Sequence, residues 1–218
     1  GAPAGTLTEL TSDFKYNVAG PTWNSASDAL YFNALAEGVQ AIWKAPVAGG
    51  GIQRLTDDDL WYDFGTPFEI VENADGTIEM LADYCSMDFP TELAKIVVGG
   101  EKTEIVQITD ENGHILSQCA KPSYEARMVR TTDGKDMLTW VVYPPKFDSS
   151  KKYPSILICL GGPQGTLSQG WSYRWNYRLM ASQGYVVVLP NRRGTTAFGK
   201  EWCAQISGDY PGQNIQDY

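Results

Sequence analysis

Two short runs of apolar residues near the end of the chain limit most strongly what it can fold into. Residues 155–160 read SILICL and residues 185–190 read YVVVLP, with no charged residue in either run. A strand that is apolar on both faces is typical of a sheet covered by helices on both sides. Residues 171–184 predict a helix that stops at Gly184, and residues 198–207 predict a second, short helix. This order predicts an α/β domain in which the two strands run parallel, either adjacent or one strand apart.

A β-hairpin is predicted just before this segment. Residues 126–145 contain two alternating strands around the turn dipeptide Asp133-Gly134, and a polar loop follows over residues 147–154. The character of the sequence changes at about residue 125. We therefore predict two units, residues 1–125 and residues 126–218.

The first 120 residues repeat a pattern in which an apolar run ends in an aliphatic residue, threonine and a nearby aspartate. The stretches LTELTSD (7–13), IQRLTDD (52–58) and IVQITDE (105–111) put Thr11, Thr56 and Thr109 45 and 53 residues apart. Hairpin-like pairs are predicted upstream of the later repeats, over residues 21–34 and 71–84. A period of about 40 to 50 residues with four short strands is typical of β-propeller blades. An antiparallel sandwich is the alternative that the pattern leaves open.

Charge and hydropathy exclude two classes of partner. The formal net charge of −9 argues against nucleic-acid binding, which needs a basic face. No window of about 18 uncharged apolar residues occurs, so we expect a soluble chain without membrane insertion. The compartment stays open between cytoplasm and periplasm, and so does the oligomeric state, a homo-oligomer included.

The four cysteines have neither paired CxxC spacing nor a spacing that suits zinc. We predict four free thiols: Cys85, Cys119, Cys159 and Cys203. Cys159 lies in the apolar run, where a small buried hydrophobic residue is expected.

A glycine pair ends the first apolar run. The stretch ILICLGGPQG (156–165) passes from strand to Gly161, Gly162 and Pro163 without a charged residue. Glycines at such a place let another group come close to the backbone, although a simple tight turn explains them too. A phosphate-binding loop is excluded because no Gly-Lys-Ser/Thr follows.

Several motifs of the last third together resemble a known family. KKYPSILICLGGPQG, then RWNYRLMASQGYVVVLPNRRGTTAFGKEW, then ISGDYPGQNIQDY are similar to the S9 prolyl oligopeptidase family of serine peptidases, above all its acylaminoacyl-peptidase and dipeptidyl-peptidase V branch. The resemblance implies an all-β propeller followed by an α/β-hydrolase domain. It implies that residues 1–125 are the last propeller blades and residues 126–218 the first part of the hydrolase, ending before the nucleophile.

The resemblance also implies a role for the glycine pair. In an α/β-hydrolase, one N–H of the oxyanion hole comes from the loop after the third strand. Gly162 is implied as that backbone donor, with Gly161 and Pro163 shaping the loop. The family usually has a histidine just before the two glycines, and Leu160 stands there in this chain.

The catalytic triad is expected outside this sequence. No GxSxG motif occurs, Ser168 lies in a predicted loop, and the single histidine, His114, is predicted on a surface hairpin turn. The two arginines after the second apolar run have two interpretations. Arg192 and Arg193 would bind a peptide carboxylate, or Arg193 would pair with an acid of the hydrolase core.

The function implied by the resemblance is hydrolysis of peptide bonds in short oligopeptides by a serine peptidase. The 218-residue chain itself is predicted to be inactive. Its partner would be a peptide substrate, and no metal or organic cofactor is implied. Two alternatives stay open: a propeller-type binding module joined to an inactive hydrolase-like domain, and an esterase.

Overall fold

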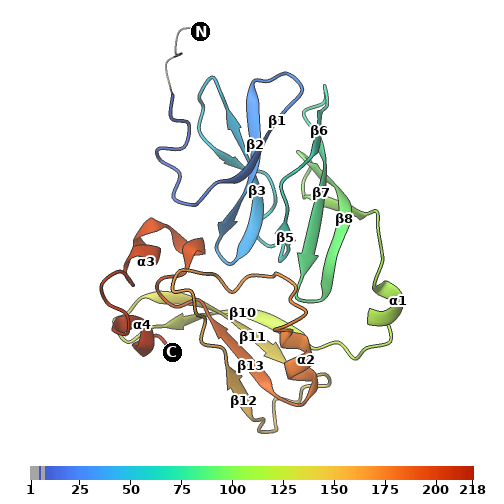
Figure 1. Cartoon of the computed structure of the whole chain (residues 1–218). Coiled ribbons are helices and arrows are strands. Elements are labelled where there is room, and N and C mark those ends of the chain that lie inside the picture. Colours follow the sequence, from blue (N-terminus) through green and yellow to red (C-terminus); the bar gives the residue numbers. More distant parts are fainter. Residues whose placement is uncertain (1–4, 6–7) are drawn as a thin grey trace.

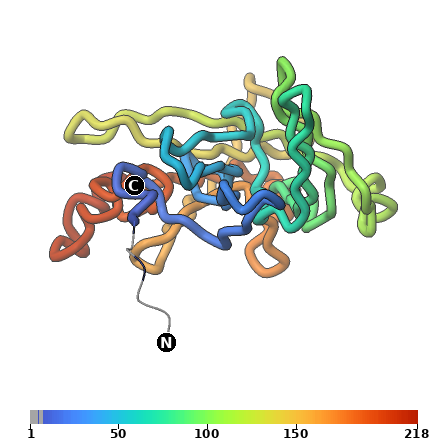
Figure 2. Tube along the Cα trace, turned by 90° about the horizontal axis from the view of Figure 1, so that it is seen from above, coloured from blue at the N-terminus to red at the C-terminus, as the bar shows by residue number. Residues whose placement is uncertain are grey.

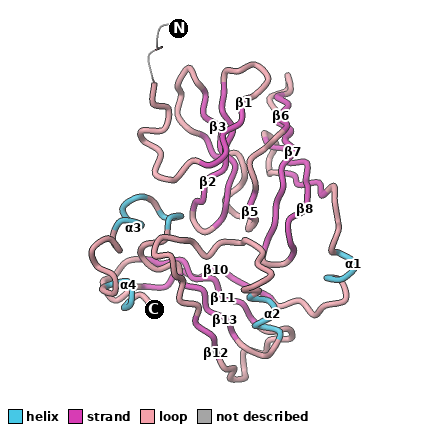
Figure 3. Tube along the Cα trace, in the orientation of Figure 1, coloured by secondary structure: helices cyan, strands magenta, loops and turns pink. Residues whose placement is uncertain are grey.

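The computed structural model describes residue 5 and residues 8–218 (Figure 1). The remaining residues, with the start of the predicted first unit and of the LTELTSD stretch, lie outside the described residues. The described chain forms three β-sheets joined by loops and a few short helices (Figure 3). The first two sheets lie side by side, and the third lies below them in Figure 1.

The first sheet is an antiparallel meander of four strands in the order β1-β2-β3-β4. Its strands are β1 (Ala19–Trp23), β2 (Ala29–Ala36), β3 (Val39–Pro46) and β4 (Gln53–Arg54). The Asn24 side chain shapes the first turn, because its Oδ1 accepts the N–H groups of Asp28 and Ala29 at 3.1 Å each. The predicted hairpin over residues 21–34 is confirmed.

The second sheet is also antiparallel. Its order is β5-β7-β8-β9, and β6 also pairs with β7. Its strands are β5 (Asp63–Phe64), β6 (Glu69–Glu72), β7 (Ile78–Ser86), β8 (Phe89–Val98) and β9 (Glu104–Gln107). The hairpin predicted over residues 71–84 is confirmed, with the Asp75 carboxylate accepting the N–H of Thr77 at 2.9 Å in its turn.

A shared apolar core holds the first two sheets together. Tyr31 and Ile42 of the first sheet pack with Met80 and Ile96 of the second, and all four are almost fully buried. Seen from above, the two sheets lie next to each other (Figure 2). Burial of apolar side chains between two sheet faces is the main favourable term for such an arrangement.

The third sheet is mixed, with the order β10-β11-β13-β12. Its strands are β10 (Ser123–Arg130), β11 (Asp136–Tyr143), β12 (Ser155–Leu157) and β13 (Val186–Pro190). The predicted hairpin is confirmed, and so are the neighbouring parallel strands, since Ile156 pairs with Val187.

The prediction that both apolar runs are fully buried is wrong, because Tyr185 of the second run is exposed and the first run is exposed in several places. β12 ends at Leu157, which is exposed, and Cys159 is exposed too. β12 is the edge strand of the sheet, whereas β13 lies between two strands. All four cysteines are free, as predicted.

The helices are shorter than predicted. Their bounds are α1 (Gly113–Leu116), α2 (Tyr177–Ser182), α3 (Lys200–Ala204) and α4 (Gln213–Gln216), with a 3₁₀ turn over Thr196–Phe198. α2 starts late because Asn176 is its N-cap: the side chain accepts the N–H of Leu179 at 2.9 Å, and its backbone is extended. His114 is exposed, as expected, but on the helix α1 instead of a hairpin. Among the described residues, no helix is long and apolar enough to cross a lipid bilayer.

The loop between β12 and α2 crosses the junction between the upper sheets and the third sheet (Figure 1). One core there combines Val39 and Met87, from the ends of the first two sheets, with Trp140, Leu167 and Val187. Polar contacts add to it, since the Glu37 N–H donates to the Ala197 carbonyl at 2.7 Å. The segment that carries the glycine pair therefore leaves the third sheet and runs directly under the first two.

Candidate active site

The glycine turn begins where β12 ends. Gly161, Gly162 and Pro163 are all exposed. Gly162 has a φ of +134°, and a Cβ there would lie 3.3 Å from the Gln164 nitrogen, so only glycine fits without strain. A Cβ on Gly161 would meet nothing within 4 Å. Among the described residues, no acceptor takes the N–H of Gly162, which leaves this donor free.

A hollow of about 510 Å³ opens beside this turn. Gly162, Pro163 and Gln164 line one side, and the segment after α3, with Ile206 and Tyr210, lines the other. The Gln164 side chain bridges the two sides by donating to the Cys203 carbonyl at 3.3 Å. A free backbone donor at the edge of an accessible hollow is the arrangement that an approaching carbonyl oxygen requires.

Three polar residues follow β13 and are buried beneath the turn. Asn191 clamps the loop after the glycines: its Oδ1 accepts the Leu167 N–H at 2.9 Å, and its amide donates to the Leu167 carbonyl at 3.0 Å. Arg192 donates to the carbonyl oxygens of Leu160 at 2.6 Å and Pro163 at 2.8 Å. Asn191 and Arg192 are at most 1% exposed, so neither side chain faces solvent.

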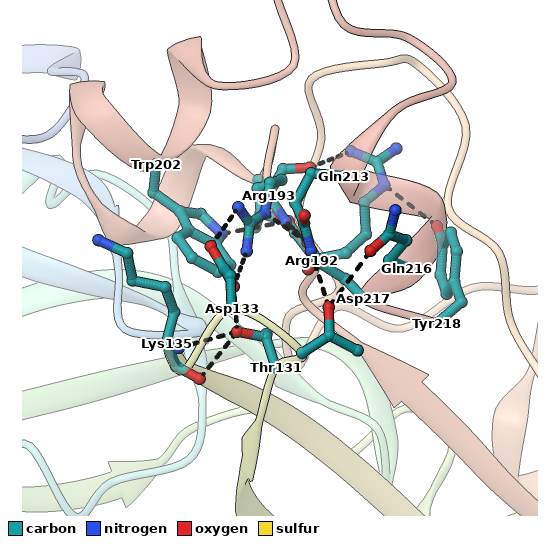
Figure 4. Close-up of polar contacts among 12 residues, drawn as sticks. Thr131, Asp133, Lys135, Arg192, Arg193, Trp202, Gln213, Gln216, Asp217 and Tyr218 are labelled. Atoms are coloured by element: carbon teal, nitrogen blue, oxygen red, sulfur yellow. Dashed lines mark hydrogen bonds and ion pairs between the residues drawn. The ribbon is translucent and has the colours of Figure 1, made fainter.

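Arg193 points away from Arg192 and binds two carboxylates (Figure 4). Its Nε donates to Asp217 Oδ2 at 2.8 Å, and its two terminal nitrogens donate to Asp133 at 2.8 and 3.0 Å. The guanidinium of Arg193 lowers the pKa of the Asp133 carboxyl well below its ordinary value. Of the two sequence-based interpretations, pairing of Arg193 with an acid is confirmed. The side-chain donors of Arg192 are engaged by protein oxygens, which argues against a peptide carboxylate as their ligand.

Ser168 and His114 have no catalytic contact with each other. The Ser168 hydroxyl donates to Asp63 Oδ2 at 2.5 Å, across the junction between the sheets. Burial raises the pKa of the Asp63 carboxyl, although the bond from Ser168 acts in the opposite direction. His114 is also far from the hollow beside the glycine turn. It lies on α1, at the opposite end of the molecule from α3, and the segment after α3 lines that hollow (Figures 1 and 2).

The four aromatic residues over residues 171–177 differ in exposure. Trp171 and Tyr177 are half-buried, whereas Tyr173 and Trp175 are exposed. Trp175 and Tyr177 line a second hollow of about 370 Å³, together with residues 157–161. Of the two exposed residues, Trp175 therefore lies beside the glycine turn, whereas Tyr173 lines another hollow, next to Leu116.

Comparison with known proteins identifies the family. Residues 171–218 match the model of the prolyl oligopeptidase family. Dipeptidyl-peptidase 5 of Porphyromonas gingivalis is 43% identical over 216 residues, which is 98% of this chain. The chain belongs to the prolyl oligopeptidase family.

One further relative and one solved structure are similar to this chain. Dipeptidyl-peptidase 5 of Porphyromonas endodontalis is 45% identical over 87% of the chain. An acylaminoacyl peptidase structure from Pyrococcus horikoshii superimposes with a TM-score of 0.73 at 20% identity, covering 95% of this chain and 30% of that one, and this likeness shows the fold alone. The chain spans 30% and 26% of the lengths of the two dipeptidyl-peptidases.

Sequence reasoning missed three contacts in this member of the prolyl oligopeptidase family. They are the bonds of Arg192 to the glycine turn, the Asn191 clamp on Leu167 and the bond between Asp63 and Ser168. The available signal for the first two was the run Asn-Arg-Arg directly after a buried strand. Polar residues at the end of such a strand become buried with it and must find partners nearby.

Proposed function

We propose that the protein containing this chain is a serine peptidase that removes dipeptides from short oligopeptides. The observation that carries this proposal is the 43% identity to a dipeptidyl-peptidase 5 over 98% of the chain. The likeness to acylaminoacyl peptidases is weaker, at 20% identity, so it supports the fold alone.

Gly162 would supply one N–H of the oxyanion hole. Its free donor, its place after β12 and the adjacent hollow all support this role. When the nucleophile attacks the scissile carbonyl, negative charge develops on the oxygen, and a fixed backbone donor stabilises that charge more than the neutral carbonyl. Gly161 and Pro163 would give the turn its shape. Leu160 does not impair a main-chain donor, because the N–H needs no side chain in front of it.

The serine, aspartate and histidine of the triad would come from parts of the protein outside this sequence, because no GxSxG occurs within it. The serine would attack, the histidine would accept its proton, and the aspartate would hold the histidine in place. We propose no metal or organic cofactor for this chemistry.

The two antiparallel sheets would be neighbouring blades of a propeller, over residues 1–125, and residues 126–218 would open the hydrolase domain. The meander order of the first sheet and its face-to-face packing on the second support this assignment. Such a propeller would restrict the active site to short or unfolded peptides.

The test uses the full-length protein and fluorogenic amides of a dipeptide and of an N-acetylated amino acid. We expect hydrolysis of the dipeptide amide, loss of activity with a serine-directed fluorophosphonate, and no turnover by the 218-residue chain. Absence of both hydrolysis and fluorophosphonate labelling in the full-length protein would leave a binding module as the function. Preference for the acetylated substrate would replace the dipeptidyl assignment with an acylaminoacyl one.

A further inference from the structure

The guanidinium of Arg192 holds both ends of the glycine turn. Its Nη2 donates to the carbonyl of Leu160 at 2.6 Å, and its Nη1 donates to the carbonyl of Pro163 at 2.8 Å. One rigid, planar group therefore restrains the peptide that enters the turn and the peptide that leaves it. A lysine ammonium cannot reproduce this, because it is a single point donor on a flexible stem.

Gly161, Gly162 and the ring of Pro163 lie between these two carbonyls. Both glycines are exposed, and the Cβ position of Gly161 is free of neighbours, so few side-chain contacts restrain them. Glycine is the residue with the most backbone freedom, and two in succession have many orientations of their N–H groups. The direction of the Gly162 N–H thus depends on the two carbonyls that Arg192 holds.

Arg192 is itself held in place by the surrounding backbone and by the hydroxyl of Tyr218. Its Nε donates to the Tyr218 hydroxyl at 3.1 Å, and its Nη1 also donates to the Arg193 carbonyl at 2.8 Å (Figure 4). Gly194 leaves the room it occupies, since a Cβ there would lie 2.5 Å from Nη1. The guanidinium is therefore preorganised and not merely near the turn.

We propose that Arg192 is the positioning residue of the oxyanion hole, directing the N–H of Gly162 toward the oxygen of the scissile carbonyl. This inference rests on the proposed function of the turn. Arg193 provides a matched control in the chain: it is adjacent and 5% exposed, but its side chain binds Asp133 and Asp217 instead of the turn.

The experiment compares Arg192→Met, Arg192→Lys and the control Arg193→Lys in the full-length protein. We measure kcat and KM on a dipeptide amide, and the affinities for a dipeptide boronate and for the free dipeptide. The boronate becomes tetrahedral on the nucleophile and places an oxygen in the oxyanion hole, whereas the free dipeptide does not need the hole. Misalignment of one oxyanion donor costs about 10²-fold in rate.

For Arg192→Met, we expect kcat to fall about 10²-fold with KM within about threefold of wild type. Boronate affinity should fall by a similar factor while dipeptide affinity stays unchanged. The kcat and boronate affinity of Arg192→Lys should lie between those of wild type and Arg192→Met. Arg193→Lys should lower the melting temperature without this loss of kcat. A wild-type kcat in Arg192→Met would overturn the proposal. So would a variant in which dipeptide affinity falls as much as boronate affinity and KM rises as much as kcat falls.

NMR order parameters of the backbone amides of Gly161 and Gly162 supply a readout independent of catalysis. We expect them to fall from about 0.85 in wild type to below about 0.6 in Arg192→Lys, and to be unchanged in Arg193→Lys. If the wild-type protein hydrolyses no peptide, the proposed function fails, and the order parameters alone decide whether Arg192 restrains the turn. Equal order parameters in wild type and Arg192→Lys would refute that restraint.

Discussion

The strongest prediction for stability concerns the two carboxylates bound to Arg193. The Asp217 side chain is fully buried, and its Oδ2 accepts both the Nε and the backbone N–H of Arg193, at 2.8 and 3.0 Å. Asp133 is about one-third exposed and takes the other face of the guanidinium. We expect Asp217→Asn to destabilise the chain more than Asp133→Asn, although both changes remove one negative charge from the same arginine.

The magnitude follows from burial. Removing one partner of a buried ion pair costs about 3–5 kcal/mol, because the other charge is left without compensation in a poorly solvated place. In Asp217→Asn, Asp133 still neutralises Arg193, and the amide oxygen keeps one acceptor. The expected loss in unfolding free energy is therefore about 2–3 kcal/mol, the range of charge-assisted hydrogen bonds. In Asp133→Asn, solvent replaces much of what is lost, and the destabilisation is smaller.

Urea unfolding of the single and double variants measures these losses. The double variant should lose more than the sum of the singles, since only then is Arg193 left without any carboxylate. The lowered pKa of Asp133 means that its stabilisation is present above the ordinary aspartate pKa and is lost as the pH falls below it. The acid sensitivity of wild type should therefore exceed that of Asp133→Asn. A larger loss for Asp133→Asn than for Asp217→Asn at neutral pH would refute the reasoning.

Three further predictions follow from individual contacts. Gly162→Ala should slow dipeptide hydrolysis by the full-length protein about 10²-fold through the strained φ of +134°, whereas the neighbouring Gly161→Ala should stay near wild type; equal kinetics in the two variants would contradict this. Asn176→Ala should lower the unfolding free energy of the chain by about 1 kcal/mol in urea titrations, because α2 loses its N-cap; an unchanged midpoint would count against the cap. Lys44 lowers the pKa of Glu72 to about 2, so stability should fall as the pH drops from about 5 toward 2, and acid titration of Glu72→Gln should show a shallower fall.

Turn residues and apolar runs in the sequence were enough to predict the hairpins and strands that depend on interactions between nearby residues. The pattern of residues 71–84 and the turn at Asp133-Gly134 correctly predicted two hairpins, because turn chemistry acts between residues a few positions apart. The two apolar runs correctly predicted neighbouring parallel strands. The helix over residues 171–184 was predicted too long, although its N-cap Asn176 was visible in the sequence.

The exposure of Cys159 and the partners of Arg192 depend on contacts between segments that are distant in the sequence. Cys159 was predicted to be buried from its apolar neighbours, but it is exposed just after β12, which is the edge strand of the sheet, and strand order is a property of the whole sheet. Arg192 looked like a ligand for a substrate carboxylate, yet its partners are carbonyl oxygens of Leu160 and Pro163, about 30 residues earlier in the chain. Composition and periodicity specify which side chains leave water, whereas the partner of a buried polar group depends on which backbone atoms the tertiary structure places within about 3 Å of it.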